Sequence, residues 1–395
     1  MPKPFLKTAT LRLLALSAAL LAALGCVKDT GGGTTLYVYD NASSSVLVWN
    51  DVNKVYSAAK GATTVPAADR TIVNGLNPSD DLAWGGLAMD STSNRLYLVT
   101  TIGQVYVINK ASTQHGTVSA LSDIISFNLG QSGVDPYSAG SVFEQAAVDG
   151  TSNTLFVLES AADGSATRVW RVTNASQMSN GAVLTPAAQY TVGISTDTFG
   201  CGVATIPGGN LYGLFGGGGT IYNGLDPIAY SGARLRQGSG GSFPSSLGNL
   251  YSSGVVVGAL TELGSPQYGS LAYDSQKSAL YTFAPSVASP TSSSILVFTT
   301  GSFSAGLNVA PSRTLAVPAL PFNGGTSLRT ISHPADGDWL LGTYFTLAPT
   351  TSVIGDGTGS TYLAIWDAPS GGGAGYTASI PGTTEIRGMA IGGTN

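Results

Sequence analysis

Residues suited to nucleophilic or metal-assisted catalysis are few in this chain. Its 395 residues include two His, His115 and His333, and two Cys, Cys26 and Cys201. These are too few for a zinc framework, and no G-x-S-x-G sequence places a serine in a sharp turn. The glycine-rich segment 216–219 lacks a following Lys-Ser or Lys-Thr, so phosphate binding is not indicated. The residue types favour binding over catalysis.

Aromatic and cationic side chains recur at matching positions and form the candidate binding set. It comprises Trp84, Phe143, Phe199, Tyr268, Arg329 and Arg387, with the polar neighbours Glu144, Gln145 and Glu385. Four aromatic rings can form a collar that stacks a ligand; alternatively they pack between neighbouring repeats. The two arginines can hold a carboxylate or another anion between them. Alternatively they pair with Glu385, Glu144 or a backbone carbonyl.

A repeat of about 60 residues must position this set. A strand–turn–strand motif occurs as LAMDSTSNRLYLV at 87–99, AAVDGTSNTLFVL at 146–158 and LAYDSQKSALYTF at 271–283, with less regular copies at 202–214 and 330–342. The candidate residues lie at the start of the first strand of each repeat. Asp90, Asp149 and Asp274 are predicted to accept Asx-turn hydrogen bonds in the hairpin, and His333 occupies the same position.

Further strands follow each motif. Third strands are predicted at Val46–Trp49, Val105–Ile108, Val169–Val172, Ile295–Phe298 and Leu363–Trp366, and the fourth repeat lacks a clear one. Fourth strands are predicted at Arg70–Val73, Ile124–Phe127, Gln189–Val192 and Arg313–Ala316. We find no amphipathic helix of three turns in this region. Four antiparallel strands per repeat, arranged radially, are typical of a β-propeller.

The two ends of the repeat region complete each other. The segment TLYVYD at 35–40 matches a second strand, and GMAIGGTN at 388–395 matches a first strand with its turn. Pairing them in one blade removes an open sheet edge. The sequence therefore predicts an all-β, six-bladed β-propeller of four-stranded antiparallel blades over residues 35–395.

The motif G-[LIV]-A-x-D…N-x-L-Y-V resembles NHL and YVTN-type repeats of exported bacterial propeller lipoproteins, within the gluconolactonase-like superfamily. Gluconolactonase-like relatives hold a divalent metal through Glu, Asn and Asp. The corresponding candidates here are Glu144, Asp197, Glu262 and Glu385. They do not share one position in the repeat, and two arginines beside them oppose a cation. A metal-dependent lactonase-like hydrolase is therefore the alternative function, and only this alternative implies a cofactor.

The N-terminal residues predict export. Three basic residues precede the apolar stretch Leu13–Leu24, which is typical of a signal peptide at residues 1–25. The segment Leu21–Cys26 resembles the lipobox of bacterial lipoproteins, with Ala23 and Leu24 in swapped order. Lipidation of Cys26 is implied, followed by a glycine-rich tether over 26–34. Alternatively, an ordinary signal peptide is cut nearby.

The resulting expectation is a lipoprotein of the cell envelope. Val27 after the Cys implies the outer membrane, with attachment through acyl chains such as palmitate. Cleavage changes the formal net charge from −5 to −8, and no Lys/Arg cluster exists, so a nucleic-acid partner is excluded. The propeller is expected to be a non-catalytic binding or scaffold module for a protein, a glycan or a small anionic ligand. The ligand is expected on the upper face, where the innermost strands begin. A purely structural envelope component is a further alternative.

Overall fold

The computed structural model describes most of the compact unit Gly33–Asn395 and none of residues 1–33. The described residues are 34–62, 64–74, 81–130, 141–160, 167–184, 189–190, 199–208, 210–223, 226–238, 255–256, 271–284, 294–299, 310–317, 324–333, 337–346, 360–369, 371, 373–383 and 385–392. In parts of several strands the backbone alone is described.

Hydrogen bonds group the described strands into six sheets, three of them formed mainly by the first half of the chain. The first has the order β26 (Ile386–Gly392), β1 (Thr35–Asp40), β2 (Ser45–Trp49), β3 (Arg70–Asn74) and β7 (Gly116–Val118). The second has β4 (Leu82–Asp90), β5 (Arg95–Thr100), β6 (Gln104–Asn109), β8 (Ile124–Leu129) and β12 (Ala182–Leu184). The third has β9 (Val142–Asp149), β10 (Thr154–Ser160), β11 (Thr167–Thr173) and β13 (Gln189–Tyr190).

The other three sheets each have four strands. The fourth has β14 (Phe199–Ile206), β15 (Asn210–Asn223), β16 (Asp226–Gly238) and β17 (Val255–Val256). The fifth has β18 (Leu271–Asp274), β19 (Ala279–Ala284), β20 (Ser294–Thr299) and β21 (Arg313–Ala316). The sixth has β22 (Gly324–His333), β23 (Gly337–Thr346), β24 (Ser360–Asp367) and β25 (Gly375–Ser379).

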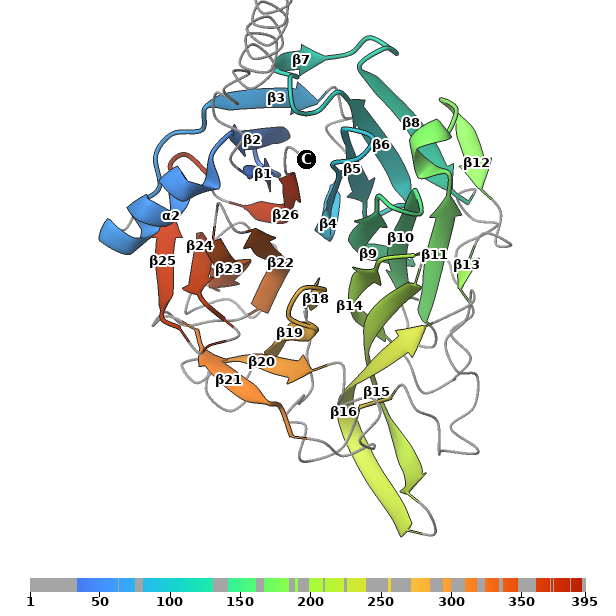
Figure 1. Cartoon of the computed structure of the whole chain (residues 1–395). Helices are drawn as coiled ribbons and strands as arrows, with labels where there is room; N and C mark the ends of the chain where they lie inside the picture. Colours follow the sequence, from blue (N-terminus) through green and yellow to red (C-terminus); the bar gives the residue numbers. More distant parts are fainter. Residues whose placement is uncertain are drawn as a thin grey trace, which may run out of the picture. The chain divides into compact units, whose positions relative to one another are not determined.

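The sheets are arranged radially as an all-β propeller (Figure 1). Their innermost strands contact one another in a closed cycle: β26, β4, β9, β14, β18, β22 and β26 again. The apolar core lies between adjacent sheets. One cluster, for example, joins Leu96 and Leu98 of the second sheet to Val46 and Val48 of the first. Packing between neighbouring sheets therefore holds the ring together.

Pairing of the chain ends is confirmed. The C-terminal strand β26 pairs antiparallel with β1, so that Thr35 lies opposite Gly392 and Leu36 opposite Ile391. Because β1 starts beside the end of β26, the chain enters the propeller at the lower face, where the innermost strands finish.

Short segments from one sheet also cover the outer edge of the preceding sheet. Strand β7 pairs in parallel with β3, and β12 pairs in parallel with β8. Thr64, from the connection between β2 and β3, forms a parallel bridge to Ser379 of β25. At three places the connection after a third strand thus reaches back to the neighbouring outer strand, which protects that edge from pairing with another chain.

Helix α2 (Val52–Gly61) belongs to the last of these connections and contacts β24 and β25 (Figure 1). Asp51 caps it by accepting a hydrogen bond from the backbone N–H of Asn53. Tyr56 stacks on Trp339 with ring centroids 4.4 Å apart and donates a hydrogen bond to Asp367. A 3-10 helix, η1, covers Ala175–Gln177. The sequence analysis predicted neither helix.

The predicted Asx turns are confirmed. Asp90 accepts hydrogen bonds from the backbone N–H groups of Thr92 and Ser93. Asp149 and Asp274 bind the N–H groups two residues later in the same way, at 3.0 and 2.8 Å. These carboxylates fix the hairpins that follow three of the innermost strands, β4, β9 and β18, at the lower face.

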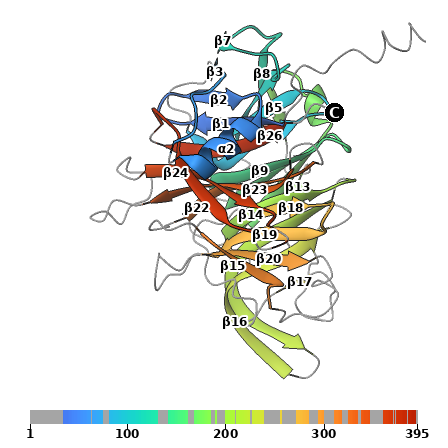
Figure 2. The ribbon, with the colours of Figure 1, turned by 60° about the vertical axis from the view of Figure 1, so that its left-hand side comes forward.

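The fourth sheet differs from the prediction. Its third strand exists as β16, which pairs with β15 along a long hairpin that extends away from the ring (Figures 1 and 2). The sequence analysis missed β16 because glycine and polar residues replace the β-branched pattern of the other third strands.

Candidate functional site

Arg387 and Trp84 come together on the upper face from two different sheets. The guanidinium carbon of Arg387, on β26, lies 4.9 Å from the ring centroid of Trp84, on β4. The Nε atom donates to Glu385 Oε1 at 2.5 Å, and Nη1 donates to the carbonyl of Leu82 at 3.1 Å. Nη1 also lies 3.3 Å from a carboxylate oxygen of Asp81. Two carboxylates therefore neutralise the charge of Arg387. Arg387 itself is only 8% exposed to solvent.

The sequence analysis gave pairing with Glu385 or a backbone carbonyl as the alternative to an anion site. Arg387 makes both of these contacts, so the alternative is confirmed for this residue. The other member of the expected anion site, Arg329, lies on β22, and its side chain is outside the described residues. Phe199 lies on β14 with its side chain likewise outside the description. Tyr268, Asp197, Glu262 and the lipidation candidate Cys26 also lie outside the described residues.

Phe143 is a packing residue between the second and third sheets. It is 3% exposed, and its ring centroid lies 6.4 Å from that of Trp170. Gly103, with φ of +82°, makes room for it, because a Cβ there would lie 2.5 Å from the Phe143 ring. The described members of the expected collar thus separate into a partly exposed Trp84 and a buried Phe143, so the structure does not bring these two together as a stacking surface.

Gln145 joins three innermost strands near the axis. Its Nε2 donates to the carbonyl of Leu271 at 3.2 Å, and its Oε1 accepts from the N–H groups of Val203 and Leu271 at 3.1 and 3.3 Å. A Cβ at Gly202 would lie 2.9 Å from Oε1, so glycine permits this approach. Gln145 is 2% exposed and therefore satisfies inward-facing backbone groups.

Glu144 is partly buried at the upper end of β9. Loss of solvation raises its pKa to about 7, and a hydrogen bond from the Ser160 side chain opposes this rise to a smaller degree. The sequence analysis considered Glu144 as a partner of the arginines or as a metal ligand, and it did not name Ser160.

Two exposed apolar side chains that the sequence analysis missed lie beside Asp81. Ile102 is 67% exposed and Val142 is 41% exposed. They flank a backbone hydrogen bond from Phe143 N to Thr101 O, and Thr101 N in turn donates to Asp81 O. We name Asp81, Trp84, Ile102, Val142 and Arg387 the upper patch. The only sequence signal for Ile102 was an isoleucine inside a turn.

A buried ion pair supports the sheet below this patch. Arg168 Nε lies 2.6 Å from Glu159 Oε2, and the indole N–H of Trp170 donates to the same oxygen at 2.7 Å. The guanidinium also lies over the Trp170 ring, at 4.7 Å. Because the charges of Arg168 and Glu159 are paired with each other, these side chains hold the start of β11 in place.

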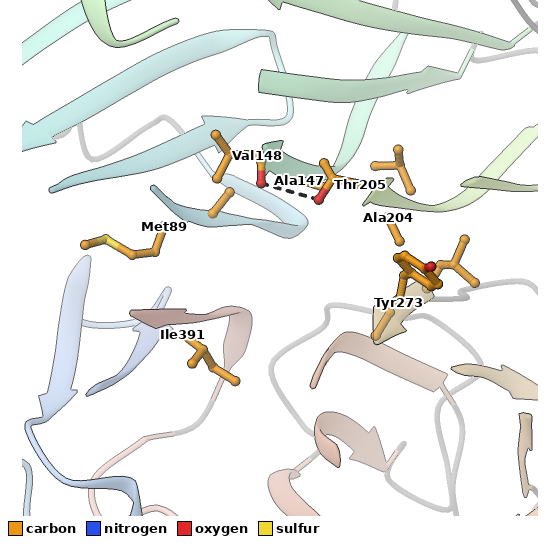
Figure 3. A pocket seen from close by; sticks show the side chains of 11 residues that line it. Met89, Ala147, Val148, Ala204, Thr205, Tyr273 and Ile391 are labelled. Atoms are coloured by element: carbon orange, nitrogen blue, oxygen red, sulfur yellow. Dashed lines mark hydrogen bonds between the residues drawn. The ribbon is translucent and has the colours of Figure 1, made fainter. Parts of the chain in front are cut away.

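A cavity of about 190 Å³ lies on the axis towards the lower face (Figure 3). Residues from five innermost strands line it, and we name one equivalent residue from each strand the axial ring: Met89, Val148, Thr205, Tyr273 and Ile391. None of the candidate residues from the sequence analysis lines this cavity.

The described part of the chain lacks two kinds of feature. No three His, Cys, Asp or Glu side chains there lie close enough together to hold a metal ion. In the same part, no helix is both long and apolar enough to cross a membrane.

No protein-family profile matches the chain, and no curated protein matches its sequence. Among solved structures, it is similar to the dihydro-heme d1 dehydrogenase NirN in complex with DHE. The two share 11% identity with a TM-score of 0.41, over 91% of this chain and 75% of that one. It is also similar to the Dos1 propeller, with 10% identity and a TM-score of 0.42, over 85% of this chain and 64% of that one.

Proposed function

We propose that this chain is an exported lipoprotein, anchored through Cys26, whose propeller binds a protein partner through the upper patch without catalysis. The observation that carries the proposal is the pairing of Trp84 with Arg387 beside the exposed Ile102 and Val142. Tryptophan is enriched among the residues that dominate protein interfaces, and exposed apolar side chains gain free energy when a partner covers them.

The charges of the patch favour a protein over a small anion or a glycan. Asp81 and Glu385 already neutralise Arg387, so an anionic ligand would have to displace a bound carboxylate. One face of the Trp84 ring carries the guanidinium, which leaves less of the ring for stacking a sugar.

The start of β1 supports an orientation for the anchored protein. Thr35 lies at the lower face, and the nine residues 26–34 span at most about 30 Å when fully extended. In this proposal the lower face is nearer the membrane, and the upper patch points away from it, where a partner can reach it.

We also propose that each of the six sheets is one blade of a six-bladed propeller. The closed cycle of contacts among six innermost strands supports this count.

Site-specific photo-crosslinking in cells tests the partner. A crosslinking amino acid replaces Ile102 or Val142, and the control position is Leu121, which is 66% exposed but lies by the lower end of β8. We expect both upper positions to capture the same protein, and Leu121 not to capture it. Trp84→Ala should reduce that product at both upper positions. Equal capture at Leu121, or a product insensitive to Trp84→Ala in a variant that still folds, contradicts the proposal.

A further inference from the structure

The axial cavity lies away from the upper patch, and no part of the proposed function uses it. Its five ring residues occupy the same position in their repeats, one before the turn aspartate in the cases of Met89, Val148 and Tyr273. The residues before the first four ring members are all alanine and also line the cavity: Ala88, Ala147, Ala204 and Ala272. Small side chains there leave space on the axis that larger ones would fill.

Hydrogen bonds with Gln145 hold two of the strands that line the cavity. Val203 and Leu271 are its first lining residues along β14 and β18, and both bind Gln145 through their backbone. The side chains of the axial ring border the remaining space on the sides formed by five of the six innermost strands (Figure 3). The hydrogen-bonded backbone of Val203 and Leu271 therefore forms part of the cavity wall.

The chemistry of the lining selects the ligand. The described lining residues carry no charge, and their side chains present methyl, methylene, thioether, phenol and hydroxyl groups, with backbone polar atoms accessible between them. Asp90, Asp149 and Asp274 directly follow three of them in the chain, so the rim repels an anion. The hydroxyl of Thr205 donates to the carbonyl of Val148 at 3.4 Å, and its oxygen keeps lone pairs that accept a further hydrogen bond.

From this geometry we propose that the axial cavity binds a small, neutral molecule of aromatic-ring size that donates one hydrogen bond to Thr205. A protein cavity of about 150 Å³ lined by apolar side chains binds benzene. The volume of about 190 Å³ therefore accommodates one or two fused rings.

Indole and 1-methylindole are suitable probes, since they share their ring system and differ in the N–H group. Titration of the purified propeller by ligand-observed NMR and by thermal shift should show saturable binding of both. Indole should bind more tightly, because it alone donates to Thr205. The nearly isosteric Thr205→Val should weaken indole and leave 1-methylindole unchanged.

Filling variants localise the binding. Val148→Phe places a ring in the cavity and should weaken both probes by at least about tenfold, which corresponds to about 1.4 kcal/mol. Ile391→Phe repeats the test from a different strand, in case one variant fails to fold. The matched control is Val183→Phe, the same substitution at an exposed position of the outer strand β12, which should bind both probes as the parent does.

Absence of binding by the parent up to the solubility of indole overturns the inference. Unchanged binding by folded Val148→Phe and Ile391→Phe overturns it as well. Equal loss of both probes in Thr205→Val contradicts the role assigned to the hydroxyl. These outcomes are independent of whether a protein partner binds the upper patch.

Discussion

At the scale of single residues, replacing Arg387 shows whether this side chain stabilises the fold or serves to bind a ligand. We expect Arg387→Ala to lower the free energy of unfolding by about 2 kcal/mol, because Glu385 and the carbonyl of Leu82 lose a charged donor. Chemical denaturation measures the change. If the role of Arg387 were to bind an anionic ligand, the result would be the opposite. Its removal would then leave the free energy of unfolding unchanged or slightly higher.

The control for this experiment is Lys54→Ala. Lys54 is 61% exposed and lies 3.9 Å from Asp69, so its ion pair is weak. Its replacement should change the free energy of unfolding by less than about 0.5 kcal/mol. A loss for Arg387→Ala no larger than that for Lys54→Ala would refute the structural role.

Glu144 should make stability depend on pH. Its pKa is about 7 in the folded chain, against 4.5 for an ordinary glutamate. Between these two values the folded state holds a proton that the unfolded state has released, so stability falls as pH rises from 4.5 to 7. Glu144→Gln removes this contribution, and the variant should gain stability relative to the parent across that range. Urea midpoints at pH 5, 6, 7 and 8 measure the difference, and a difference that stays constant would show that Glu144 is solvated.

Local sequence signals predicted residue roles only where the partners are close along the chain. The Asx turns at Asp90, Asp149 and Asp274 use N–H groups two or three residues away, so the sequence was sufficient. The repeat alignment also identified Arg387 and its neighbour Glu385. It did not identify Asp81, because that residue lies in a connection between sheets and has no repeat position.

At the scale of elements, the strand that completes the first sheet carries the clearest prediction. Removing Arg387–Asn395 deletes nearly all of β26, including the buried Met389 and Ala390, and exposes the edge of β1. We expect a loss of at least about 4 kcal/mol, because strand pairing and apolar burial disappear together. Thermal unfolding and limited proteolysis measure it, with cleavage expected near Leu36–Tyr39.

The matched control ends the chain at Gly392, which keeps all of β26. This variant should melt close to the parent. If the longer truncation also melts like the parent, pairing of the chain ends does not stabilise the ring.

Elements that depend on distant contacts escaped the sequence analysis. The connections that reach back to outer strands are short, as in the three-residue β7 and β12, and no local pattern marks so short a strand. Helix α2 did carry a signal, with Asp51 as a cap and Val52, Val55 and Ala59 on one buried face. At ten residues it falls just short of the three turns required in the sequence analysis.

At the scale of the whole molecule, the repeat period and the matching ends predicted the all-β propeller and its closure. They did so because the innermost strands repeat a pattern of apolar residues before a turn, which begins with an aspartate in three of the repeats. The axial cavity was not predicted, since the space depends on five strands meeting at the axis. The sequence directed attention to the upper face, whereas the cavity lies towards the lower one.

Anchoring through Cys26 is the central claim about the molecule in its cell. Each buried acyl CH₂ contributes about 0.8 kcal/mol, and two or more chains give stable attachment to a membrane. The intact mass of the mature protein extracted from membranes tests this claim most directly. The account predicts a chain that begins at Cys26 and carries the added mass of acyl groups, with both features lost in Cys26→Ser. A mature chain that begins at another residue, or an unmodified Cys26, would contradict it.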